Sequence, residues 1–124
     1  MPTLAELNRL GSALSSEQLL HLKRLVSWLG LLADLSFSDL LLFVPAEVGS
    51  KKFAVVSQIR PTTGQTLYED DHVGMKVNNV ERPLIFQSYE LGHTVEGEVP
   101  IKPSNRLARV TSIPVVFGPD VIAV

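Results

Sequence analysis

The sequence predicts a single α+β domain in which one mostly antiparallel central sheet carries N-terminal helices on one face. Two observations predict this class. Apolar residues recur at the 3-4 spacing of an amphipathic helix up to about residue 32, and from residue 40 short β-type runs alternate with glycine and proline. A length of 124 residues is enough for one domain with its own hydrophobic core.

The first expected helix is short. Thr3 followed by Glu6 has the spacing of a capping box, in which each side chain accepts a hydrogen bond from the backbone amide of the other residue. Gly11 is placed to end this helix. Residues 1–14 are therefore interpreted as a lead-in, and residues 15–124 as the domain itself.

A second helix is expected from Ser15, which has Gln18 three residues later, to about residue 32. Near its end apolar side chains, Trp28 among them, surround almost the whole circumference. Such a helix is either buried in its own domain or shared with a second subunit or a neighbouring domain. In the second alternative, the dimer interface consists of four apolar residues at 3-4 spacing: Leu19, Leu22, Val26 and Leu29.

After residue 36 the chain reads as short strands separated by turns. The expected strands span residues 40–44, 53–59, 95–101, 106–112, 113–117 and 121–124. The first two are predicted to form an antiparallel pair through a turn at residues 49–52. A short helix around residues 84–89, ended by Gly92, is expected between the second and third strands.

Charge and composition exclude several classes of function. Eleven Lys and Arg against thirteen Asp and Glu disfavour nucleic acid as a partner, because binding phosphates requires a basic surface. Without cysteine there is no disulfide, no thiolate nucleophile, no thiolate metal site and no thiol-based sensing. The N-terminus lacks the features of a secretory signal, and no apolar run approaches the roughly 20 residues that cross a bilayer. We therefore expect a cytoplasmic protein that does not enter a membrane.

Three histidines are the candidates for acid–base or metal chemistry. His21 lies on the polar side of the second helix and is expected in water. His72 follows Asp70 and Asp71, which favour its imidazolium form and can assist a metal ion, although a polar loop of this kind more often simply faces solvent. His93 follows a helix end, where a cation interacts well with the helix dipole. No catalytic motif is present, so neither a catalytic residue nor a metal site is assigned.

The segment from residue 58 to residue 66 has the richest chemistry. One arginine, three threonines and two glutamines surround a proline and a glycine. Guanidinium and hydroxyl groups bind phosphates and carboxylates, and Gly64 permits close approach of the backbone. The alternative is an ordinary loop in which the threonine side chains bond to their own backbone.

Several blocks of the sequence resemble a known family. Residues 31–40, residues 58–66 and residues 70–74 are similar to the N-terminal sensory domain of the PdtaS-type cytoplasmic histidine kinases of actinobacteria. The closing residues, 112–117 and 121–124, are similar to the last strands of that domain. The resemblance covers the chain from about residue 14 onward.

The resemblance implies a GAF-like fold and a place in a two-component signalling protein. Because the sequence ends inside the expected strand at residues 121–124, we expect a fragment of a longer protein whose final helix is absent. The resemblance implies that a PAS domain and a histidine-kinase module follow in a homodimeric kinase. That kinase uses ATP and Mg²⁺ to phosphorylate a histidine and transfers the phosphoryl group to a response regulator. This chain would modulate those steps, carry no enzyme activity and need no cofactor.

Domains of this family commonly bind a small molecule between the sheet and the overlying helices and loops. For such a ligand the resemblance supplies no residue assignment, and the side-chain chemistry favours Arg60 for an anionic group, with Thr62, Thr63 and Tyr89 as hydrogen-bonding partners. The alternative is an interior filled by Phe and Leu side chains, in a domain that acts only as a dimerisation and relay module. A small stand-alone enzyme that uses His72 is the third hypothesis.

Overall fold

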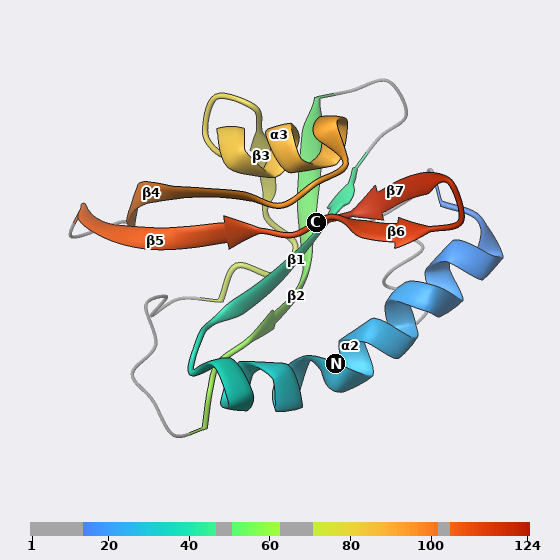
Figure 1. Cartoon of the computed structure of the whole chain (residues 1–124), viewed down its shortest axis with the longest axis horizontal. Coiled ribbons are helices and arrows are strands. Elements are labelled where there is room, and N and C mark those ends of the chain that lie inside the picture. Colours follow the sequence, from blue (N-terminus) through green and yellow to red (C-terminus); the bar gives the residue numbers. More distant parts are fainter. Residues whose placement is uncertain (1–13, 47–50, 63–70, 102–104) are drawn as a thin grey trace.

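The computed structural model describes residues 14–46, 51–62, 71–101 and 105–124 (Figure 1). The elements follow in the order α2 (Ser16–Ser36), β1 (Leu40–Pro45), β2 (Lys52–Ile59), β3 (Lys76–Asn78), α3 (Pro83–Leu91), β4 (Val95–Ile101), β5 (Arg106–Ser112), β6 (Val115–Phe117) and β7 (Asp120–Ala123). One N-terminal helix with antiparallel strands confirms the predicted α+β class. The short helix predicted near Thr3 lies outside the described residues.

Helix α2 begins at the predicted capping box. The Ser15 hydroxyl accepts a hydrogen bond from the Gln18 N–H at 3.2 Å, and the Gln18 Oε1 accepts one from the Ser15 N–H at 3.0 Å. These two bonds satisfy amides that the first turn of a helix leaves without a partner. The helix continues past its predicted end to Ser36 and stops at Phe37, whose φ of 53° is left-handed. Neither helix in the described part of the chain is long and apolar enough to cross a bilayer.

Strands β1, β2 and β3 form an antiparallel sheet in that order. Leu40 lies opposite Ile59 at one end of the β1–β2 pair, and Pro45 lies opposite Phe53 at the other, which confirms the predicted pairing. The register shifts once, between Leu42 and the next residue of β1. The sequence did not predict β3, because a strand of three residues carries no usable periodicity.

β7 leads into the first sheet through Val124, while β4 and β5 form a separate two-stranded sheet. β4 pairs with β5, and β6 pairs with β7, both antiparallel. The Val124 N–H donates to the Phe43 carbonyl at 2.9 Å, and the Phe43 N–H donates to the Val124 carbonyl at 2.8 Å. Two opposite residues that exchange both hydrogen bonds in this way form one closely spaced hydrogen-bonded pair of an antiparallel ladder. β1 therefore has β2 along one edge and the end of the chain along the other.

The sheet separates two hydrophobic cores, with α2 and α3 on opposite sides of β1 and β2 (Figure 1). Neighbouring residues of β1 point to opposite faces, so Leu42 packs toward α2 and Phe43 toward α3. The core beneath α2 consists of Leu19, Leu22, Val26, Leu29, Leu42, Val44, Val56, Ile122 and Ala123. The core beneath α3 consists of Phe43, Phe53, Val55, Val77, Ile85, Phe86 and Val124.

The four residues predicted as a dimer interface lie inside the domain. Leu19, Leu22, Val26 and Leu29 are only 5%, 0%, 1% and 6% exposed, because α2 turns this face onto the sheet. A side chain without accessible surface cannot contact a second subunit. The assignment of these four residues is therefore corrected from interface to core.

Candidate functional site

The end of β2 is tied to the end of α2 by one carboxylate. Oδ1 of Asp34 accepts hydrogen bonds from the Thr62 N–H at 2.7 Å and from the Thr62 hydroxyl at 2.9 Å. Pro61, between β2 and this threonine, is buried and has a fixed φ, which limits the paths that the backbone can take here. Thr62 gives both of its donors to the carboxylate, so this part of the predicted ligand loop has a structural function.

Arg60 lies just beyond β2 and is exposed. A residue that precedes proline favours an extended backbone conformation. Two residues along the chain, Thr62 holds the Asp34 carboxylate, whose negative charge disfavours an anion bound at Thr62. Thr63, the third residue of the predicted set, lies outside the described residues.

Tyr89 belongs to a different part of the molecule. Its ring lies edge-on to the ring of Phe53 at 5.1 Å between centroids, and Phe86 packs on the same phenylalanine at 4.6 Å. Phe53 is near the start of β2, whereas Arg60 follows its end. Seven residues of extended strand separate two positions by about 23 Å. The structure therefore does not bring Tyr89 together with Arg60 and Thr62.

The environment of Tyr89 also shifts the pKa of its phenol. Burial raises the pKa of the Tyr89 phenol above 10.0, and the negative charge of Asp120 raises it further. Both effects disfavour the phenolate. The phenol is consequently a neutral hydroxyl at physiological pH, which can donate or accept a hydrogen bond but cannot serve as a base.

The face of the sheet beneath α3 is filled by the side chains of the domain itself. Three phenylalanines, Phe43, Phe53 and Phe86, pack there with aliphatic residues, and Leu41 and Tyr89 lie against this cluster. The two ring contacts of Phe53 are edge-on, a favourable arrangement of aromatic quadrupoles. The described side chains on this face thus form one packed aromatic and aliphatic cluster.

His72 lies in a turn that is held against β2. The His72 N–H donates to the Gln58 Oε1 at 2.6 Å, and the His72 Nδ1 lies 3.1 Å from the sulfur of Met75. The Asp71 carboxylate accepts a hydrogen bond from the Val73 N–H at 3.0 Å, which closes a local turn. Asp70, the other carboxylate considered beside His72, lies outside the described residues. The structure shows these groups stabilising a turn.

The other two histidines have structural surroundings. His21, which the sequence placed in water, is half-buried, and its ring lies 5.2 Å from the ring of Phe117. The polar side of α2 at this point is covered by β6, a contact that helical periodicity does not reveal. His93 is exposed just after Gly92, the left-handed residue that ends α3, as expected. In the described part of the chain no group of three or more His, Asp or Glu residues is arranged to hold a metal ion.

Sequence reasoning missed two buried serines that connect α3 to β5. The Ser88 hydroxyl lies 3.1 Å from the carbonyl oxygens of both His93 and Ser112, and donates its proton to this pair. Ser88 is fully buried and Ser112 is 1% exposed. The position of Ser88, three residues after the core residue Ile85, was the available signal, because i and i+3 share a helix face.

A family model and curated sequence relatives match this chain. A family model described as the GAF domain of histidine kinase PdtaS matches residues 4–124. The sensor histidine kinase PdtaS of Mycobacterium tuberculosis is 35% identical over 129 aligned residues, which cover 100% of this chain and 25% of that protein. The PdtaS of Mycolicibacterium smegmatis is 33% identical over 92 residues, which cover 74% of this chain and 18% of that protein.

A solved structure agrees with these sequence relatives. The sensor region of a sensor histidine kinase has a TM-score of 0.73 and 32% sequence identity, over 99% of this chain and 40% of the solved chain. The chain thus spans about a quarter of the length of the first curated relatives it matches. The family model, the Mycobacterium tuberculosis relative and the solved structure each cover nearly the whole chain, so the chain belongs to the family of PdtaS histidine kinase GAF domains.

Proposed function

We propose that this domain sets the rate at which a histidine-kinase module in the same polypeptide phosphorylates itself, and hence the transfer of the phosphoryl group to a response regulator. The match of residues 4–124 to the PdtaS GAF domain carries the proposal. The PAS domain, the kinase module with its ATP and Mg²⁺, and a cytoplasmic location belong to the proposed whole protein. No catalytic step is assigned to residues of this domain.

Within this function we favour transmission through helix packing. The filled core beneath α3 and the use of both Thr62 donors on Asp34 support it. α2 packs against β2 through the larger core and is tied to the end of β2 by Asp34. A shift of α2 therefore changes the sheet and the helix together, which is the kind of two-state packing change that signalling proteins use.

The proposal is tested in the full-length natural protein. Asp34→Ala removes the tie between α2 and β2, and Glu90→Ala removes an exposed carboxylate from α3 as a matched control. Autophosphorylation is followed with labelled ATP and Mg²⁺. We expect Asp34→Ala to change the initial rate at least threefold, with the KM for ATP unchanged, and Glu90→Ala to behave as the natural protein does. Equal rates in all three proteins would contradict the proposal.

Ligand sensing at Arg60 is the second candidate, favoured by the exposed position of this residue just beyond β2. A guanidinium binds phosphate through two parallel hydrogen bonds. Inorganic phosphate is the probe: it should raise the melting temperature of the natural protein and leave that of Arg60→Ala unchanged. An equal response of both proteins would remove Arg60 from the site.

A further inference from the structure

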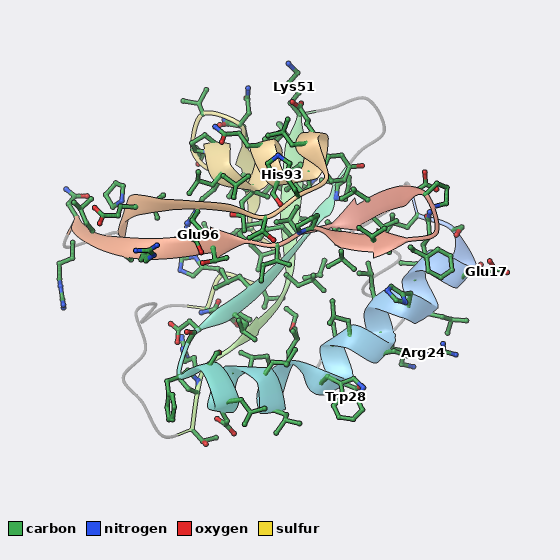
Figure 2. The ribbon with its side chains drawn as sticks, viewed as in Figure 1. Glu17, Arg24, Trp28, Lys51, His93 and Glu96 are labelled. Atoms are coloured by element: carbon green, nitrogen blue, oxygen red, sulfur yellow. The ribbon has the colours of Figure 1, made fainter. Side chains whose placement is uncertain are left out.

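Helix α2 has a second apolar surface, opposite the one that it buries. Five large residues form this outer face and are exposed by 42% to 68%: Leu20, Trp28, Leu31, Leu32 and Leu35. Figure 2 shows Trp28 directed away from the strands, with Arg24 one turn before it on the same side. Exposed apolar residues gathered on one side of a helix mark a candidate interaction surface.

Arg24 lies on the same side of the helix as Trp28, Leu31 and Leu35 of the outer face. These four residues are separated by four, three and four positions, a spacing that is the same from either end of the helix. Two such helices that pack antiparallel therefore meet layer by layer, with Trp28 of each copy against Leu31 of the other. The 3-4 alternation is the spacing of helices that pack side by side.

Charge favours the antiparallel arrangement over the parallel one. A parallel pair stacks Arg24 on Arg24, which is repulsive, and places the two Trp28 rings in one layer. An antiparallel pair instead brings Arg24 beside Leu35 of the second copy, at the C-terminal end of its helix. That end has no basic residue in its last turn. A cation there is stabilised by the negative end of the helix dipole.

The exposed area is sufficient for a pair of domains. At these exposures, four leucines and a tryptophan leave on the order of 500 Å² of apolar side chain in water on each copy. Complete burial of these residues on both copies would remove about 1,000 Å² from water. Specific interfaces begin at roughly this area.

We propose that the outer face of α2 is the surface on which two copies of this domain associate, with their α2 helices antiparallel. The proposal differs from the corrected interface, because it uses the opposite side of the helix. It does not depend on the proposed kinase regulation, since it rests only on exposure, spacing and charge.

The test is disulfide trapping in the full-length protein, with the unsubstituted protein as blank. Arg24→Cys and Leu35→Cys are prepared as separate variants and oxidised with diamide, alone and mixed. In the antiparallel pair, position 24 of one copy faces position 35 of the other, so the disulfide should form in the mixture and in neither variant alone. A disulfide requires Cα atoms within about 7 Å, which makes the readout selective.

Two further substitutions serve as control. Leu31→Lys places a charge in the centre of the outer face and should lower the yield of the mixed disulfide at least tenfold. Leu107→Lys changes a leucine of β5 that is even more open to solvent, at 68% exposure against 51% for Leu31, and should leave the yield unchanged. An unchanged yield with Leu31→Lys would show that the disulfide forms by random collision, and would overturn the proposal.

The remaining outcomes also overturn it. A disulfide in Arg24→Cys alone means that the helices pair in parallel. Absence of any disulfide means that another part of the polypeptide covers the outer face or that the face stays in water. Kinase activity is measured separately in Leu31→Lys, so failure of the pairing and failure of the regulatory proposal are distinguished.

Discussion

The hydrogen bonds of Asp34 to Thr62 allow a quantitative test of the structure. One carboxylate oxygen accepts two bonds, at 2.7 and 2.9 Å, from a residue 28 positions away in sequence. A hydrogen bond to a charged group contributes about 1.5–3 kcal/mol when it is well shielded, and less when water competes for it. Asp34 is only half-buried, so we expect Asp34→Ala to lower the free energy of unfolding by about 1–2 kcal/mol.

The second substitution separates the two bonds. Thr62→Val keeps the backbone N–H and removes the hydroxyl, so it should cost about 0.5–1 kcal/mol. Once Asp34→Ala has removed the carboxylate, Thr62→Val has no hydroxyl–carboxylate bond left to remove. The sum of the two single losses of stability should therefore exceed the loss in the double variant by about 0.5–1 kcal/mol, which is the coupling energy of that bond.

Urea denaturation followed by circular dichroism measures all four proteins. The slope m should be the same in each, because none of the changes alters the surface exposed on unfolding. Glu90→Ala, the exposed carboxylate of α3, is the control and should lie within about 0.5 kcal/mol of the natural chain. If the coupling energy is zero while Asp34→Ala is destabilising, the carboxylate acts by another route and the described tie is wrong.

Three further predictions concern the core and the sheet. Leu22→Ala should destabilise the chain by about 2–5 kcal/mol in urea denaturation, because Leu22 is fully buried. Leu20→Ala, on the exposed outer face, should cost less than about 1 kcal/mol. Equal losses of stability in the two variants would contradict the packing of α2. Gly97→Val should cost about 1–3 kcal/mol, since a Cβ at Gly97 would lie 3.0 Å from Leu84, and adding Leu84→Ala should recover part of that loss. Stability should fall above pH 10, because the folded state holds the Tyr89 proton more tightly than the unfolded state does. In a spectrophotometric titration, Tyr89→Phe should lack the phenol titration that belongs to Tyr89. If the loss of stability with rising pH is the same in that variant as in the natural chain, the assignment to Tyr89 is refuted.

Local signals in the sequence predicted most of the secondary structure. The start of α2 was predicted because a capping box involves residues only three apart, Ser15 and Gln18. The pairing of β1 with β2 was predicted because two adjacent β-type runs joined by a short turn have few other arrangements. The buried face of α2 followed from the 3-4 spacing of leucines such as Leu22, although that spacing does not say whether the covering surface belongs to the same domain.

The candidate site was predicted less well, because distances across the fold are not encoded locally. The sequence grouped Arg60 with Tyr89 by chemistry, but Tyr89 packs on Phe53, and β2 separates Phe53 from Arg60 by about 23 Å. Nothing in the sequence indicated that the N–H and hydroxyl of Thr62 would both donate hydrogen bonds to Asp34. His21 was expected in water for the same reason, because the strand that covers it comes from the other end of the chain.

The sequence by itself determined the α+β class, the family and the amphipathic character of α2, since all three depend on residue types and on spacings within one element. Only the tertiary structure decided that Leu19, Leu22, Val26 and Leu29 face inward, and that the outer face with Trp28 is exposed. The physical reason is that an amphipathic pattern specifies which side chains avoid water. Which surface covers them depends on contacts between residues far apart in the chain.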